Sequence, residues 1–153
     1  MTSKPRWLTE DEQNAWRAWL EVSALLPDRL NRDLIEQRGI TLADYVILVH
    51  LSEEPDRRLR MSDLADRTSS SRSRLSHQID RMEAAGLVTR EVCSDDKRGT
   101  FATLTASGWD TIVAAAPDHV ESVRRNLIDV LGPDRFTRFG RDCQAIAEHL
   151  RDT

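Results

Sequence analysis

The sequence predicts a mainly α-helical fold with one small β-hairpin. Three observations support this: apolar residues recur at helical spacing along most of the chain, Ser or Thr precedes several of these segments, and residues 87–104 change to short strand-like runs. The expected order is helix, helix, helix–turn–helix, hairpin, helix, helix. A chain of 153 residues fits one domain.

Two helices are expected first. Thr9 and Glu12 form the pattern of a capping box, and the helix that they begin is expected to end at Gly39. Its apolar positions recur at helical spacing: Ala15, Trp16, Trp19, Leu20, Leu26, Leu30 and Leu34. The second helix is expected to begin at Thr41 and to end before Pro55, because proline cannot continue a helix.

Two short helices in close succession follow a polar link, RRLR, at residues 57–60. Ser62 is the expected N-cap of the first, and the serine cluster at 69–71 caps the second, which spans about 72–85 and ends at Gly86. The short turn between them makes this pair a helix–turn–helix unit.

The hairpin and two further helices complete the chain. Strands are expected at 87–92 and 101–104, on either side of the charged sequence SDDKRG. Thr105 then caps a long helix, and Gly132 with Pro133 separates it from a last helix.

The helix at 72–85 has two distinct faces when it is drawn at 100° per residue. Leu75, Ile79 and Met82 form the predicted buried stripe. Hydrogen-bond donors gather on another side: Ser70, Arg74, His77 and Arg81, flanked by Ser73 and Gln78. The major groove of DNA admits one α-helix, and such side chains contact base edges and phosphates there. The alternative is a solvated helix face that local charge pairs stabilise.

The hairpin tip supports the DNA interpretation. Lys97 and Arg98 lie at the end of a two-stranded projection, and a narrow minor groove attracts an inserted arginine. The acidic neighbours Asp95 and Asp96 are placed to orient Arg98 through charge-assisted hydrogen bonds. The alternative is an ordinary polar turn.

The charge balance argues against nucleic acid until its distribution is considered. The formal net charge is -4 and the isoelectric point is about 5.6. Residues 57–98 contain ten basic and seven acidic side chains, whereas the rest of the chain contains twelve basic and nineteen acidic ones. A basic segment between acidic ones indicates a local site for a polyanion.

These motifs resemble those of the MarR family of winged helix–turn–helix transcription factors. The resemblance is most specific over the run LADRTSSSRSRLSHQIDRMEAAGLVTREVCSDDKRGTFATLTASG. It implies that residues 71–81 lie in the recognition helix and that Asp95 and Arg98 form a pair at the tip of the wing. It also implies one domain over 1–153.

Within that domain, the resemblance implies a DNA-binding lobe at 41–104 and dimerisation helices at 9–39 and 105–151. The protein is then expected to be a homodimeric repressor that binds a pseudo-palindromic DNA duplex and that a small molecule or stress signal releases. The candidate DNA-binding residues are Ser70, Ser71, Arg72, Ser73, Arg74, Ser76, His77, Arg81, Asp95, Lys97, Arg98 and Gly99.

Aromatic residues are the candidates for the dimer and effector sites. A shared interface would account for the aromatic residues of the terminal segments, which are Trp7, Trp16, Trp19, Phe136 and Phe139. A small aromatic or phenolic effector is expected to contact some of Trp16, Trp19, Tyr45 and His50. In each case the alternative is that the side chain fills the core of one subunit.

No enzymatic activity, cofactor or metal is expected. Ser76, His77 and Asp80 are near neighbours, but the adjacent Ser76 and His77 point in different directions on one helix and no oxyanion hole accompanies them. The four histidines lie on separate predicted helices without paired metal-ligand spacing. Two alternatives remain: a winged-helix module that binds protein instead of DNA, and a redox sensor that uses Cys93. Cys143 occupies an apolar helical position and is expected to be inert.

The expected location is the cytoplasm, on the nucleoid when the protein is bound to DNA. No apolar signal region begins the sequence and no run reaches the length of a membrane span. Two cysteines are too few for a disulfide framework.

Overall fold

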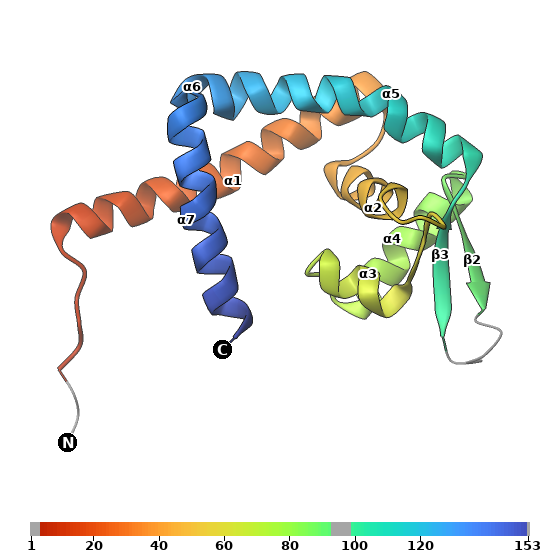
Figure 1. Ribbon diagram of the computed structural model, residues 1–153, viewed down its shortest axis with the longest axis horizontal. Coiled ribbons are helices and arrows are strands. Elements are labelled where there is room, and N and C mark those ends of the chain that lie inside the picture. Colours follow the sequence, from red (N-terminus) through yellow and green to blue (C-terminus); the bar gives the residue numbers. More distant parts are fainter. Residues whose placement is uncertain (1–3, 93–98, 153) are drawn as a thin grey trace.

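Two long helices lie side by side and connect the two ends of the molecule. A computed structural model describes residues 4–92 and 99–152. Helix α1 (Glu10–Arg38) runs along α5 (Ala106–Val123), and both reach a lobe that holds the remaining short elements (Figure 1). At the opposite end, α7 (Pro133–Arg151) crosses α1. In the described part of the chain, no helix is both long and apolar enough to cross a bilayer.

The lobe combines three helices with a three-stranded antiparallel sheet. Strand β3 lies in the centre, because Ala102 is paired with Leu59 on one side and with Arg90 on the other. The elements of the lobe are α2 (Leu42–Ser52), β1 (Arg58–Arg60), α3 (Met61–Arg67), α4 (Arg72–Ala84), β2 (Val88–Val92) and β3 (Thr100–Leu104). The prediction of a mainly helical fold with a small β component is therefore confirmed.

The hydrophobic core lies between these elements and the adjoining parts of α1 and α5. Its most deeply buried side chains include Leu34, Leu48, Leu51, Leu64, Leu75, Ile79 and Met82. Gly108 brings the start of α5 against the base of the sheet, since a Cβ atom at this position would lie 2.1 Å from the Leu87 carbonyl oxygen. This contact fixes where the long helix leaves the lobe.

Four predicted N-caps are confirmed. Thr9 and Thr41 form capping boxes with Glu12 and Asp44, and the hydroxyls of Ser71 and Thr105 accept hydrogen bonds from the third residues of their helices. Each cap satisfies a backbone N–H that has no partner within its helix.

Two predictions about the segment at 57–62 are wrong. The polar link contains strand β1, in which Leu59 is buried while Arg58 is exposed. Ser62 lies within α3 rather than before it: the N-cap is Arg60, and the Ser62 hydroxyl donates to Asp63 Oδ1 at 3.1 Å. A three-residue strand has too short an alternation to be distinguished from a link.

The region after α5 also differs from the expected single helix. Residues Arg124–Ile128 form a π-helical segment, η1, which is followed by α6 (Asp129–Leu131). Gly132 then turns the chain at φ = 80° into α7. Together these segments set the direction in which α7 crosses α1.

Candidate nucleic-acid interface

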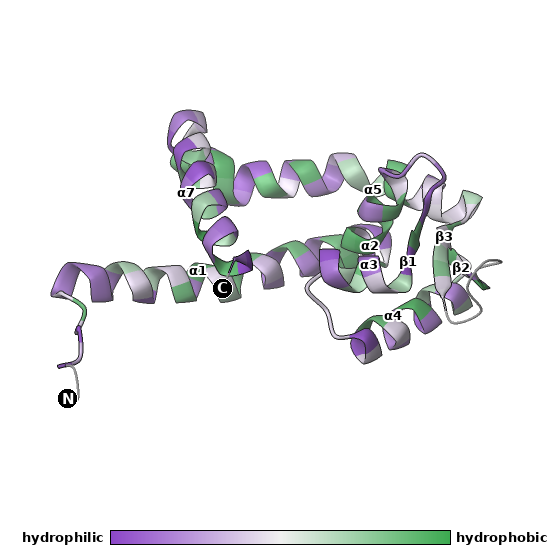
Figure 2. Ribbon diagram, turned by 60° about the horizontal axis from the view of Figure 1, so that its bottom comes forward, coloured by the Kyte–Doolittle hydropathy of each residue, from purple (hydrophilic) through white to green (hydrophobic). Residues whose placement is uncertain are grey.

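Helix α4 lies at an outer edge of the lobe, beside strands β2 and β3 (Figure 2). Its predicted buried stripe is confirmed, because Leu75, Ile79 and Met82 are each at most 2% exposed. These three side chains anchor the helix and fix which of its faces meets solvent.

The opposite face of α4 is polar and exposed. Asp80 and Glu83 are exposed as well, and the exposed candidate residues on or beside the helix are Ser71, Arg72, Ser73, Arg74, His77 and Arg81. Most of them line a shallow hollow together with Thr41 and Ala43 at the start of α2. The structure therefore brings five candidate residues, two of them arginines, together around one hollow, whereas Arg72 lines a different cleft.

The other candidates on or beside α4 are half-buried and already have partners. The Ser70 hydroxyl donates to the Thr68 carbonyl at 3.4 Å, and the Gln78 amide donates to Asp44 Oδ1 at 3.0 Å. Ser76 accepts from the guanidinium of Arg90. The Ser70 bond lies within the turn before α4, whereas the Gln78 and Ser76 bonds hold α4 against α2 and the sheet.

The N-terminus of α4 is suited to an anion. Ser71 occupies the N-cap, no acidic residue lies in the first turn, and Arg72 and Arg74 follow directly. The backbone N–H groups of a first helical turn and the positive end of the helix dipole both favour a phosphate group.

A second cleft separates α4 from the sheet. It has a volume of about 350 Å³ and is lined by Arg60, Met61, Ser62, Arg72, Ser76, Arg90, Gly99 and Thr100. Sequence reasoning missed Arg60 and Arg90. Their only signal is an arginine at a polar position of a short strand, and such residues are common on solvated sheet surfaces.

The tip of the hairpin lies outside the described residues. This applies to Asp95, Lys97 and Arg98, and also to Cys93. Gly99 is described and lines the second cleft. Strands β2 and β3, which come before and after these residues, stand next to α4 (Figure 2).

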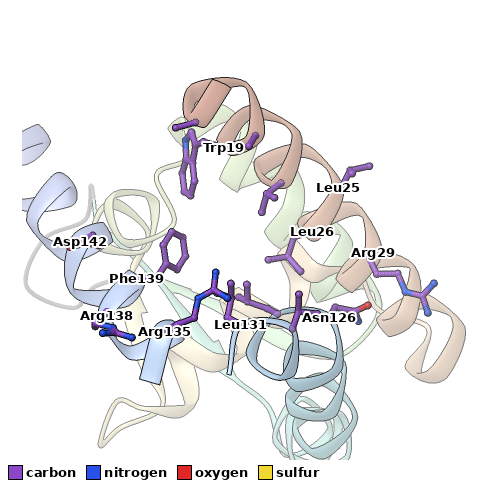
Figure 3. Close-up of a pocket in the computed structure, with 15 residues that line it drawn as sticks. Trp19, Leu25, Leu26, Arg29, Asn126, Leu131, Arg135, Arg138, Phe139 and Asp142 are labelled. Atoms are coloured by element: carbon purple, nitrogen blue, oxygen red, sulfur yellow. The ribbon is translucent and has the colours of Figure 1, made fainter. Parts of the chain in front are cut away.

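The candidate effector residues do not share one cavity. Trp19 lines an apolar groove of about 930 Å³ between α1, η1, α6 and α7, where its ring faces Phe139 at 6.0 Å between centroids (Figure 3). Trp16 is 51% exposed and is not part of this groove. Tyr45 is buried and packs on the His119 ring at 4.3 Å, whereas His50 is half-buried on α2.

Burial shifts the pKa values of both Tyr45 and His119. It lowers the pKa of His119 and raises the pKa of Tyr45, so that both groups favour their neutral forms. His119 Nδ1 has no hydrogen-bond partner among the described residues. Within that same part of the chain, no group of three His, Cys, Asp or Glu side chains is placed to hold a metal ion.

Comparison with known proteins identifies the family. A model of the MarR family matches residues 38–99. The structure of AbsC, a MarR family transcriptional regulator from Streptomyces coelicolor, is 54% identical, with a TM-score of 0.90 over 97% of this chain and 100% of that one. The chain belongs to the MarR family.

Other MarR-related proteins support the assignment. Sco3205, a MarR family transcriptional regulator from Streptomyces coelicolor that was solved in complex with DNA, is 44% identical, with a TM-score of 0.92 over 97% of this chain and 93% of that one. The transcriptional regulator HosA from Escherichia coli is 29% identical over 101 residues, or 66% of this chain and 73% of HosA. The family and these relatives are transcriptional regulators rather than enzymes, and the lobe has the family's winged-helix fold.

Proposed function

We propose that this MarR-family regulator binds a specific DNA duplex, with α4 in the major groove and the hairpin as a wing in the minor groove. The observation that carries the proposal is the exposed polar face of α4, which presents Arg74, His77 and Arg81, while Arg72 is exposed in the first turn of the same helix. Residues 41–104 form the DNA-binding lobe in this proposal, and Arg98 of the hairpin enters the minor groove. The DNA complex of Sco3205 supports it by similarity.

Selection of bound sequences from a random duplex pool tests the proposal. The purified chain is expected to enrich one pseudo-palindromic sequence. Its affinity, measured by fluorescence anisotropy, should fall steeply with salt, because each phosphate contact releases counterions. No enrichment, together with a flat salt dependence, would contradict DNA recognition and would favour a winged-helix module that binds protein.

We also propose that the chain acts as a homodimer through helices at 9–39 and 105–151. Large apolar side chains remain exposed on these helices when one chain is considered alone: Trp16, Trp19, Leu20, Val22, Leu25, Ile35, Val113, Val120, Val130, Ile146 and Leu150. Exposed apolar side chains in such number are typical of a protein–protein interface, and four of them, Trp19, Val22, Leu25 and Val130, line one groove. A second copy that fills the groove at Trp19 and Phe139 would bury some of these side chains, and a dimer would present two copies of α4 to two half-sites.

Light scattering coupled to size exclusion tests the dimer. The wild-type chain should have twice the mass of one chain, 17.5 kDa. Leu25→Glu places a charge on a groove residue that is 59% exposed, so it should dissociate the dimer without unfolding the chain. Ala84→Glu adds the same charge at an exposed position of α4, outside both proposed dimerisation segments, and should leave the mass unchanged. A monomeric wild type would contradict the dimer.

The regulatory part of the proposal is repression that a small aromatic or phenolic molecule relieves. The apolar groove at Trp19 and the stacked Tyr45–His119 pair are two aromatic environments that support it. A ligand releases DNA only when it binds the free and DNA-bound arrangements with different affinity. A panel of aromatic acids and phenols, tested for release of the enriched duplex, should contain at least one active compound. Release by oxidants instead would indicate a redox sensor.

A further inference from the structure

Arg90 of strand β2 reaches across to α4 and contacts it at successive turns. Its Nη2 atom donates to the Ser76 carbonyl oxygen at 2.7 Å and lies 3.3 Å from Ser76 Oγ. The same atom lies 2.8 Å from Asp80 Oδ1. The backbone N–H of Arg90 donates to Glu83 Oε1 at 2.9 Å. One residue of the wing is thereby bonded to three residues of α4.

These three residues lie on one side of α4. Their spacing of four and then three residues places Ser76, Asp80 and Glu83 along one stripe, which borders the buried stripe. The Arg90 side chain is 27% exposed, and its Nε atom is buried without a hydrogen-bond partner among the described residues. Charge-assisted bonds from a planar guanidinium are stronger and more directional than those between neutral groups. The contact is therefore a fixed joint rather than a loose surface pair.

We propose that Arg90 is a positioning residue for DNA recognition, which fixes the wing relative to α4. This inference rests on the proposed function, in which the helix and the wing enter adjacent grooves. The helix and the wing fit adjacent grooves of one duplex only when the distance between them is constant, and the bonds from Arg90 to α4 set that distance. In this role Arg90 acts through Ser76 and Asp80.

Direct contact with a phosphate is the competing role, because Arg90 lines the cleft that Arg60 and Arg72 also line. The two roles make opposite predictions for Asp80, which is 54% exposed. In a phosphate-binding role, Asp80 competes for the guanidinium and repels DNA, so Asp80→Asn should tighten binding. In the positioning role, Asp80→Asn loosens the joint and should weaken specific binding although it removes a negative charge.

Anisotropy titrations over a series of KCl concentrations distinguish these roles. The probes are the duplex that the wild type enriches and an unrelated duplex of equal length. Asp80→Asn and Arg90→Gln are each expected to weaken binding to the enriched duplex by about tenfold, on the scale of one lost hydrogen bond to a charged group. Neither variant should change the slope of log affinity against log salt concentration by as much as the loss of one phosphate contact would.

Three controls separate positioning from charge and from stability. Asp66→Asn removes an exposed carboxylate of α3 and should slightly strengthen binding to both duplexes. His77 Nδ1 lies 3.9 Å from Asp80 Oδ2, so a second explanation of the Asp80→Asn effect is a change at His77. If Asp80 acts through Arg90 instead, the effect should persist in a His77→Gln background. Arg90→Lys keeps the charge without the planar fork, so its specific affinity should also fall. Circular dichroism confirms that each variant is folded at the assay temperature.

Hydrogen–deuterium exchange tests the joint without DNA. Arg90→Gln should increase exchange in β2 and in the second half of α4, and should leave α7 unchanged. Unchanged exchange, equal or tighter binding by Asp80→Asn, or a salt slope that falls by about one charge in Arg90→Gln would each overturn the positioning role. A wild-type chain that enriches no duplex would overturn the proposed function and, with it, any role of Arg90 in recognition.

Discussion

At the scale of single residues, Arg74 offers the most direct test of base recognition. Its side chain is exposed in the first turn of α4, and a bidentate arginine–guanine contact discriminates by about 1–3 kcal/mol. Arg74→Ala should therefore weaken binding to the enriched duplex by about that amount and relax the preference at one base pair. Repeating the selection with the variant measures both effects.

The control for Arg74 is Arg141→Ala, which removes the same charge from an exposed position of α7. It should retain the complete sequence preference. A loss that is uniform across all sequences would instead identify Arg74 as a phosphate contact.

His119 should make stability depend on pH. Burial lowers the pKa of His119 in the folded chain, so the unfolded chain binds a proton first as the pH falls. Well above pH 6.5 neither state binds this proton and the free energy of unfolding is unaffected. As the pH drops below about 6.5, the free energy of unfolding decreases. His119→Phe should retain the packing on Tyr45 and reduce this decrease.

Thermal unfolding between neutral and mildly acidic pH measures the His119 effect. The comparison variant is His77→Gln, which removes a histidine whose side chain is 82% exposed. Equal pH dependence in the wild type and His119→Phe would contradict the assignment.

How far the sequence predicts a residue's environment depends on where its partners lie. The stripes of α4 follow from the helical period alone, so the burial of Leu75 and the exposure of Arg74 were predictable. Gln78 and Arg90 are held by Asp44 and Asp80, which belong to other elements. No local pattern contains such pairs, and the joint at Arg90 was therefore missed.

At the scale of elements, a buried polar cluster joins α1 to α5. The Asp33 carboxylate is 5% exposed and accepts from Ser122 Oγ at 2.5 Å, while Arg29 and Arg125 lie 3.0 and 3.3 Å from its oxygens. The Ser122 hydrogen bond lowers the pKa of Asp33 against the opposing effect of burial, and both arginines assist it. The cluster fixes one long helix on the other.

Replacement of Asp33 by Asn should destabilise the chain by about 2 kcal/mol at neutral pH, as expected for lost charge-assisted hydrogen bonds. Because the pKa of Asp33 is lowered on folding, its contribution is complete above about pH 4 and disappears as the pH falls through its folded value. The difference between wild type and variant should shrink in acid. Urea unfolding at two pH values measures it.

Asp28→Asn provides the comparison for Asp33. The Asp28 side chain is 61% exposed and pairs with Arg32 at 3.0 Å on the same helix. An exposed pair of this kind contributes at most about 1 kcal/mol, so this variant should remain close to wild type. Equal losses in the two variants would show that the Asp33 cluster does not stabilise the helix junction.

Two glycines should respond in opposite ways to alanine. Gly108 is buried, and a Cβ atom there would lie 2.1 Å from the Leu87 carbonyl oxygen and 2.7 Å from Leu104 Cδ1, so Gly108→Ala should displace α5 from the sheet. In α7, a Cβ atom at Gly140 would meet no atom within 4 Å, and Gly140→Ala should stabilise that helix by about 0.5–1 kcal/mol. Melting temperatures that moved in the same direction would contradict this geometry.

Most helix boundaries were predictable, because caps are local signals. Thr9, Thr41, Ser71 and Thr105 each bond to a backbone N–H three residues ahead. Strand β1 was not predictable, because it exists only through its pairing with the distant strand β3. The same applies to the π-helical segment at 124–128, since an irregular helical turn has no sequence signature comparable to a cap.

At the scale of the whole molecule, positive and negative charge occupy different segments. The segment at 57–98, which contains α4 and the sheet strands β1 and β2, has three more basic than acidic side chains, whereas the rest of the chain has seven more acidic than basic ones. The surplus acidic residues should repel a duplex that approaches any other surface. Overall net charge is thus a poor guide to a polyanion site, because the potential near a surface depends on the nearest charges.

Neutralising part of this acidic surface should weaken the discrimination between specific and non-specific DNA. Glu21, Glu36 and Glu121 are exposed on α1 and α5, outside the lobe, and their joint replacement by Gln should leave the fold intact. Affinity for an unrelated duplex should rise several-fold at low salt, while affinity for the enriched duplex should rise less, because short-range contacts determine it. The effect should disappear at high salt, where the Debye length falls to about 3 Å. A specificity ratio that the triple variant leaves unchanged at low salt would show that the acidic helices do not direct where DNA binds.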